Sequence, residues 1–227
     1  MYKKITHTIT EEEHFDLPAD TEIKRMLDNG NNGNNGYNGY DDMRPMVGAT
    51  TADKFRADVN AYFTTMHQRL TSFATATENG DMDALLTEET AYFDEVNDLG
   101  LMLRPYYGIE FNERLTQVFR GVGLGMVGIC RNLKFKIDVK NQITNLDSNF
   151  DGFDLLLNQY NNNWFPGSGK RMWVAIRESL VGEVTAIINQ DDTTSASAHT
   201  QAAERISTFA NSFANSVIQQ YPNKFIQ

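Results

Sequence analysis

Few residues in this chain could support chemistry, and the clearest are one histidine and several glutamates in predicted helices. The candidates for a shared metal site are His67, Glu88, Glu89, Glu95, Glu178 and Glu183. Helical bundles bind metals through Glu and Glu-x-x-His groups that project inward from facing helices. The one such spacing here, Glu11 to His14, lies near the N-terminus. Because carboxylates without partners normally stay in water, we interpret the acidic residues as a solvated face. The alternative is a metal site that uses His67, Glu178 and Glu183.

Few residues in this sequence could form a pair of a nucleophile and a general base. The remaining histidines, His7, His14 and His199, lie in the N-terminal arm or at the start of a predicted helix. Cys130 is the single cysteine, so an intramolecular disulfide is excluded. It lies in an apolar helical segment and is predicted to be a small core residue. We therefore predict no catalytic residue and no cofactor.

Two glycine motifs resemble nucleotide-binding loops. Gly123 to Gly128 contains the G-x-G-x-x-G pattern, which binds a dinucleotide where it directly follows a buried strand. Here it follows NERLTQVFR, whose spacing is helical, so we predict close packing of neighbouring helices through glycine. The second motif, GSGK, departs from a Walker sequence, because Trp164 stands in place of its first Gly and Arg171 in place of Ser or Thr. Neither motif is predicted to bind a nucleotide.

The composition limits the classes of function. The chain has 227 residues, of which 41% are hydrophobic, and this is sufficient for a buried core. Its net charge of −10 argues against nucleic acid, whose binding needs clustered Lys and Arg, and against an anionic membrane surface. No segment reaches the roughly 20 apolar residues of a membrane span, and no signal-peptide pattern follows Lys3 and Lys4. We expect a protein of the cytoplasm or of the interior of a particle.

The first 50 residues differ from the rest. Residues 2–9 are predicted to be extended, and Ala19 to Asp28 has the pattern of a short amphipathic helix. The following NGNNGNNGYNGYDD is low in complexity and is predicted to be a flexible linker. Apolar residues of this arm, among them Ile5, Ile9 and Phe15, predict contact with a protein partner or self-association. Residues 51–227 form the predicted main domain.

Six amphipathic patterns follow one another in this domain, with apolar residues three and four positions apart. The predicted helices begin near residues 51, 82, 109, 139, 169 and 195. Thr51 is the predicted cap of the first helix. The sixth is predicted to open at Ser195 or Ser197 and to end before Pro222. Because strand signals are few, we predict an all-α fold, a six-helix up-and-down bundle with an extended N-terminal arm.

The first of two aromatic corners lies between the second and third predicted helices and comprises Pro105, Tyr106, Tyr107 and Gly108. Pro105 has no N–H and disfavours helix at the residue before it, so the second helix is predicted to stop at Leu103 or Arg104. Gly108 can take the positive φ that such a turn needs.

The second corner comprises Trp164, Phe165, Pro166 and Gly167. Phe93-Asp94 and Phe153-Asp154 precede their corners at about the same distance, which predicts an internal helix-corner-helix repeat. We predict that the aromatic residues of both corners cap a core, and the alternative is a recognition surface.

Four segments carry a resemblance to a known group of proteins: the LxPYYG corner, the NNNWFPG corner, MHQRLT in the first helix and the closing FANSFANSVIQQYPNKF. They resemble bacterial helical-bundle proteins, common in bacilli, that are often labelled acetylglutamate kinase although they have no kinase motif. The likeness covers about Asp53 to Phe225. It implies the bundle fold, with histidines on the first helix and on the helix after each corner. Here His67 matches the first, the helix after Gly108 has no histidine, and the helix after Gly167 has Glu178 instead.

Taken together, these patterns predict a non-enzymatic structural or interaction protein built on a helical bundle. The Asn-rich composition is compatible with a component of a larger assembly or viral particle. The alternative is a ligand-binding or metal-binding bundle with enzymatic activity. The two predictions differ in whether the protein, purified without chelator, retains a stoichiometric metal.

Overall fold

A computed structural model describes residues 50–225, and every regular element among them is helical. The elements are α2 (Ala52–Asn79), α3 (Met82–Lys134), α4 (Lys140–Tyr160), α5 (Ser168–Ile188), α6 (Asp192–Gln220) and the short 3-10 helix η1 (Pro222–Lys224). They belong to the second of two units, Met46–Gln227. The predicted all-α class is confirmed. The predictions for the arm and the linker lie outside the described residues.

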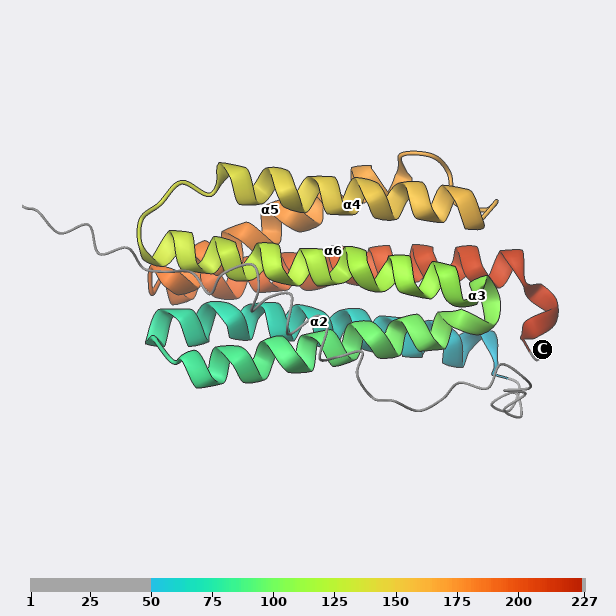
Figure 1. Cartoon of the computed structure of the whole chain (residues 1–227), viewed down its shortest axis with the longest axis horizontal. Coiled ribbons are helices and arrows are strands. Elements are labelled where there is room, and N and C mark those ends of the chain that lie inside the picture. Colours follow the sequence, from blue (N-terminus) through green and yellow to red (C-terminus); the bar gives the residue numbers. More distant parts are fainter. Residues whose placement is uncertain (1–49, 226–227) are drawn as a thin grey trace, which may run out of the picture. The chain divides into compact units, whose positions relative to one another are not determined.

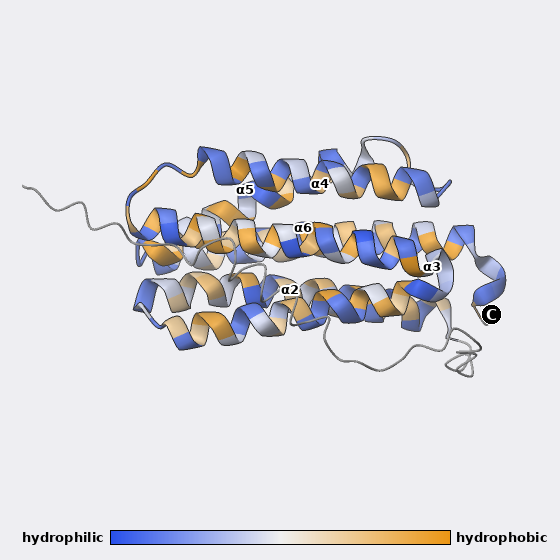
Figure 2. Ribbon diagram, in the orientation of Figure 1, coloured by the Kyte–Doolittle hydropathy of each residue, from blue (hydrophilic) through white to orange (hydrophobic). Residues whose placement is uncertain are grey.

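The long helices run side by side along one axis of the bundle, and α3 reverses its direction near its middle (Figure 1). α2 packs mainly against α3 and α6, α5 against α6, and α4 against α3. Apolar and polar residues recur along each helix (Figure 2). With helical periodicity, the apolar residues gather on one side, which can pack in the interior. Within residues 50–225, no helix is both long enough and apolar enough to cross a membrane.

Residues 50–225 contain five α-helices rather than the predicted six, because α3 passes the first corner with helical conformation on both sides of it. Its two arms meet at Gly108, whose φ of 86° and ψ of −177° are not helical. The positive φ expected at Gly108 is confirmed, but the prediction that the helix stops at Leu103 or Arg104 is wrong. Pro105 is exposed and lies within one turn of the reversal, so its missing N–H removes a single hydrogen bond from the end of an arm.

Of two predicted helix starts, one is confirmed and the other is wrong. The Thr51 hydroxyl accepts a hydrogen bond from the Lys54 N–H at 3.1 Å, so the predicted cap of α2 is confirmed. The predicted start of α6 at Ser195 or Ser197 is wrong, because the helix begins at Asp192. The cap is Asp191, whose carboxylate accepts hydrogen bonds from the backbone N–H and the hydroxyl of Thr194 at 3.1 and 2.6 Å.

The glycine run lies inside the second arm of α3, where neighbouring elements approach its backbone closely. A Cβ at Gly121 would lie 2.5 Å from the Asn149 side chain of α4. One at Gly123 would lie 2.5 Å from the Tyr92 ring of the other arm. Real Cβ atoms do not approach so closely, so larger residues would push the neighbours away. The predicted close packing through glycine is confirmed.

The second corner is organised by a buried carboxylate. Asp154 of α4 accepts hydrogen bonds from Trp164 Nε1 and from the backbone N–H groups of Gly167 and Gly169, each at 2.9 Å. Because the two glycines lie at the start of α5, this carboxylate also neutralises the positive end of that helix. One side chain therefore joins the end of α4 to the beginning of α5.

The corner aromatics cap the core as predicted, with one exception. Tyr107 and Trp164 are buried and Tyr106 is half-buried. The Tyr107 hydroxyl accepts a hydrogen bond from the buried Asn161 amide at 2.7 Å. Phe165, with 75% of its surface exposed, does not cap the core. The internal repeat stays a prediction, since the first corner is a reversal at Gly108 and the second is a loop over residues 161–167.

We expect Gly108→Ala to destabilise the domain. A φ of 86° combined with ψ near 180° is open almost to glycine alone, and holding another residue there costs about 1–3 kcal/mol. The measurement is the free energy of unfolding in urea, followed by circular dichroism. Gly182→Ala on α5 is the matched control, because a Cβ there meets nothing within 4 Å and alanine favours helix. Equal losses for the two variants would show that the reversal does not depend on Gly108.

Candidate metal centre

A carboxylate from α5 lies between two histidines, one from α2 and one from α6. The Oε2 atom of Glu183 is 2.7 Å from His67 Nε2, and its Oε1 atom is 2.7 Å from His199 Nδ1. The two imidazole rings are stacked, with centroids 4.8 Å apart. We call these three residues the His-Glu-His cluster. Each offers one ligand atom, and the three atoms lie within 4.8 Å of one another.

Helical periodicity places each member of the cluster on an apolar helix face. His67 lies one turn before Leu70, and Glu183 lies one turn after Leu180. His199 lies two turns before Ile206. Residues three, four and seven positions apart share one side of a helix. The apolar stripes that build the core therefore carry these three polar side chains to the same place.

The cluster is buried at one side and open at the other. Glu183 is 1% exposed and His67 is 3% exposed, whereas 46% of the His199 side chain is exposed. The Thr71 hydroxyl donates a third hydrogen bond to the carboxylate, 2.8 Å from Oε1. Burial raises the pKa of Glu183, but the hydrogen bonds from both histidines and from Thr71, with the charge of His67, together hold this pKa below its usual range. Glu183 is therefore an ionised carboxylate in an almost dry site.

Two imidazole nitrogens and one carboxylate form a donor set that suits Fe, Zn and similar divalent ions. With bond lengths of about 2.1 Å, ligand atoms of a tetrahedral site lie about 3.4 Å apart. The present separations of 2.7 Å to 4.8 Å bracket this value. An adjustment on the order of 1 Å would complete the site, and the half-exposed side chain of His199 has the freedom to make it. Three protein ligands leave further coordination positions open.

The structure brings together two of the three sequence-predicted metal candidates. His67 and Glu183 meet, so the placement of Glu183 on a solvated acidic face is wrong. Glu178 does not join them, because its side chain is 63% exposed and lies 3.7 Å from Arg177. The remaining glutamates, Glu88, Glu89 and Glu95, are partly buried residues of α3 outside the cluster. Glu88 forms an ion pair with Arg69 at 2.8 Å.

His199 is not among the predicted metal ligands, because a sixth helix that opens at Ser195 or Ser197 places it at the helix start. With the true start at Asp192, His199 lies in the third turn of α6, where it faces α5. Its spacing of seven from Ile206 is the signal that could have found it.

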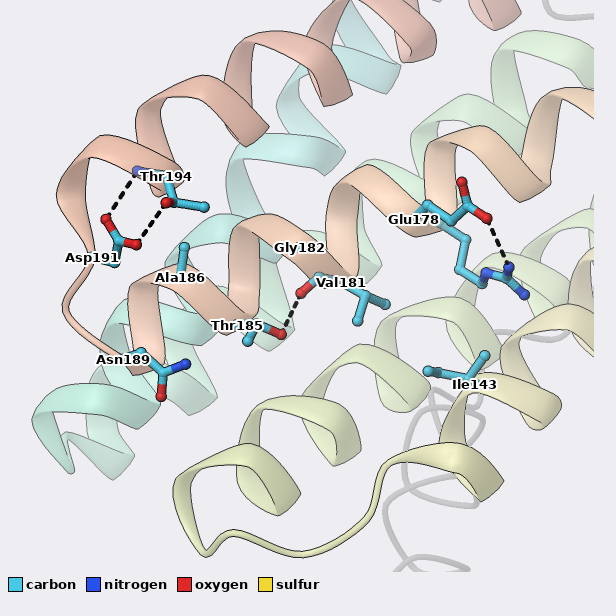
Figure 3. A pocket seen from close by; sticks show the side chains of 10 residues that line it. Ile143, Glu178, Val181, Gly182, Thr185, Ala186, Asn189, Asp191 and Thr194 are labelled. Atoms are coloured by element: carbon cyan, nitrogen blue, oxygen red, sulfur yellow. Dashed lines mark hydrogen bonds and ion pairs between the residues drawn. The ribbon is translucent and has the colours of Figure 1, made fainter.

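A surface groove of about 590 Å³ lies along α5, between α4 and the start of α6 (Figure 3). Ile143, Val181 and Ala186 give it an apolar lining. Several of its polar groups pair with one another, as the dashed hydrogen bonds between Asp191 and Thr194 show. With an apolar lining and polar groups that already pair with one another, the groove has the character of an interaction surface rather than of a catalytic site.

A comparison of the chain with protein-family models, with curated proteins and with solved structures finds no match. The resemblance drawn from the corner motifs therefore stays a prediction.

Cys130 is confirmed as a core residue, and we expect its thiol to be inert in the folded protein. It is fully buried, and burial raises its pKa to about 12, so the reactive thiolate is absent near neutral pH. A chromogenic disulfide reagent at pH 8 should label it only as fast as the protein unfolds. Labelling in urea, where the whole chain is open, serves as the control. Rapid labelling of the native protein would contradict this placement.

We expect Glu183→Ala to lower the free energy of unfolding by about 2 kcal/mol or more, because the change leaves the buried His67 ring and the Thr71 hydroxyl without their hydrogen-bond acceptor. The measurement is urea unfolding at pH 7 with a chelator present, so that metal plays no part. Glu178→Ala is the matched control on the same helix and should stay within about 0.5 kcal/mol of the parent protein. Similar values for both variants would mean that the cluster contributes nothing to the fold.

Proposed function

We propose that this chain is a metal-binding helical bundle in which His67, Glu183 and His199 hold one divalent transition-metal ion. The single observation that supports the proposal most is the Glu183 carboxylate, 1% exposed and 2.7 Å from a nitrogen of each histidine. This proposal takes up the metal-binding alternative and departs from the expectation of no cofactor.

Stability alone is a poor reason for such a cluster. Replacing a buried ion pair with apolar residues of similar volume is often neutral or stabilising, so the fold has no need of charges at these positions. Buried apolar residues, Leu70, Leu180 and Ile206, lie one or two helical turns from the three side chains. The Glu183 carboxylate also carries a negative charge in a site with little water. A divalent ion bound there would offset that charge.

The donor set favours a reactive site over a closed structural one. Structural zinc sites use four protein ligands, whereas catalytic sites keep at least one position open. When bound, such an ion can activate water or hold a small ligand at the open position. His67 and Glu183 would hold it rigidly from the buried side, and His199 would cover it at the surface. Thr71 would orient the carboxylate through its hydrogen bond to Oε1.

The groove along α5 favours a second candidate function, that of an interaction protein. The segment between α3 and α4 adds exposed apolar side chains, with Phe135 and Ile137 71% and 56% exposed. Exposed apolar surface of this kind often marks a protein contact. Self-association through residues 1–50, a place in the cytoplasm or in a particle, and a role as a virion component stay predictions.

We expect one equivalent of Fe(II), Zn(II) or Co(II) to bind chelator-treated protein, measured by isothermal titration calorimetry without oxygen for Fe(II). Co(II) should also give visible d–d absorption, whose intensity reports the coordination number. His67→Ala, Glu183→Gln and His199→Ala should each abolish stoichiometric binding, because each removes or neutralises a ligand. Thr71→Val should weaken binding about tenfold or more, because it removes the partner that orients the carboxylate.

Glu178→Gln is the control, since it removes an exposed carboxylate of the same helix and should bind as the parent does. Wild-type protein that binds no ion more tightly than Glu183→Gln would disprove the metal proposal. The groove would then stand as the better candidate.

A further inference from the structure

A small cavity lies in the core beside the His-Glu-His cluster. Its volume is about 40 Å³, every helix from α2 to α6 contributes to its wall, and the residues that line it are all buried. His67 forms part of this wall. Leu70 and Leu180 also line it, and they lie one helical turn from His67 and Glu183. The cavity and the proposed metal site therefore share the His67 imidazole.

The wall of this cavity is almost entirely apolar. Two of its aromatic residues carry polar groups, but both groups are hydrogen-bonded elsewhere. The Tyr92 hydroxyl donates to the Phe119 carbonyl at 2.9 Å, and Trp173 Nε1 donates to Asp147 Oδ1 at 2.9 Å. A buried water needs about two to four polar partners, and His67 alone remains to offer one. The cavity thus favours an apolar occupant over water.

Size restricts the occupant further. One water needs at least about 10–15 Å³ of such volume, so 40 Å³ is enough for a molecule of a few heavy atoms at most. Pockets for ordinary organic ligands are about 300–1,000 Å³. A diatomic gas fits, and a metabolite does not.

We propose that this cavity binds an uncharged diatomic gas of the size of dioxygen and supplies it to the metal beside His67. Supply to the metal rests on the proposed function, whereas occupation of the cavity by gas does not. A site with two histidines, one carboxylate and open positions is the arrangement with which non-haem Fe(II) takes up dioxygen. An apolar cavity against one of those histidines would concentrate a gas where the open position can receive it.

Xenon tests the cavity in metal-free, full-length protein. In a xenon-pressurised crystal, we expect a xenon atom inside the cavity, in contact with the His67 ring, and in solution a ¹²⁹Xe chemical shift that depends on protein concentration. Val122→Ile adds a methyl group to the wall and should remove the shift. Val118→Ile makes the same change one turn earlier on α3, outside the wall, and should retain it.

Absence of xenon from the wild-type cavity would overturn the proposal, and so would an unchanged shift in Val122→Ile. The crystal of the wild-type protein decides the question even if Val122→Ile does not fold.

Nitric oxide tests the supply to the metal. In Fe(II)-loaded protein, we expect nitric oxide to form an Fe–NO species detectable by electron paramagnetic resonance. Its association should be about tenfold slower in Val122→Ile than in Val118→Ile, with equal Fe(II) affinity. Equal association rates would overturn the supply route. Xenon binding without metal binding would reject the proposed function and keep the gas cavity, whereas metal binding without xenon would reject the cavity alone.

Discussion

A carboxylate that is 1% exposed has to find its hydrogen bonds inside the protein, and Glu183 finds three of them, from two residues of α2 and one of α6. An ionised group left without partners in such a place would cost several kcal/mol. The requirement fixes how α2, α5 and α6 lie against one another around the cluster, because a displacement of any of them breaks one of these contacts. The atoms that hold three helices in register are the atoms that would bind the metal.

The features that bring these helices together lie at some distance from the cluster. The reversal of α3 at Gly108 lays its two arms against each other, so that Tyr92 of the first arm packs on Gly123 of the second. The absence of a side chain at Gly123 lets the Tyr92 ring approach, and this ring forms part of the cavity wall beside His67. The size of the cavity therefore depends on a glycine that has no contact with the candidate site.

Much of the fold was readable from the sequence, because helix stripes and caps are local signals. Thr51 and the apolar spacing of each helix were sufficient for the all-α class. The helix end predicted from Pro105 was wrong, because a proline in the last turn of a helix removes a single hydrogen bond from its end. That the reversal lies at Gly108 depends on tertiary packing, which the sequence does not show.

Only part of the candidate site could be predicted from the sequence. His67 and Glu183 lie on apolar helix faces. Because glutamate as a residue type favours water, the prediction nevertheless placed Glu183 on a solvated face. The contact of these two residues with His199, which follows His67 by more than a hundred residues in the sequence, depends on how α2, α5 and α6 pack.

The position of the cluster, between water and the apolar core, gives its two sides different properties. On the side of His199, a hydrated cation can exchange water for protein ligands one at a time, because the histidine that completes the set is itself in contact with solvent. On the side of His67, the wall of the cavity excludes ions and favours small uncharged molecules. In the proposed site, an ion would therefore arrive from the side of His199 and an uncharged molecule from the side of His67, without competing for one path. A site placed wholly in the core would exclude the ion, and one placed wholly on the surface would give a gas no apolar volume in which to concentrate.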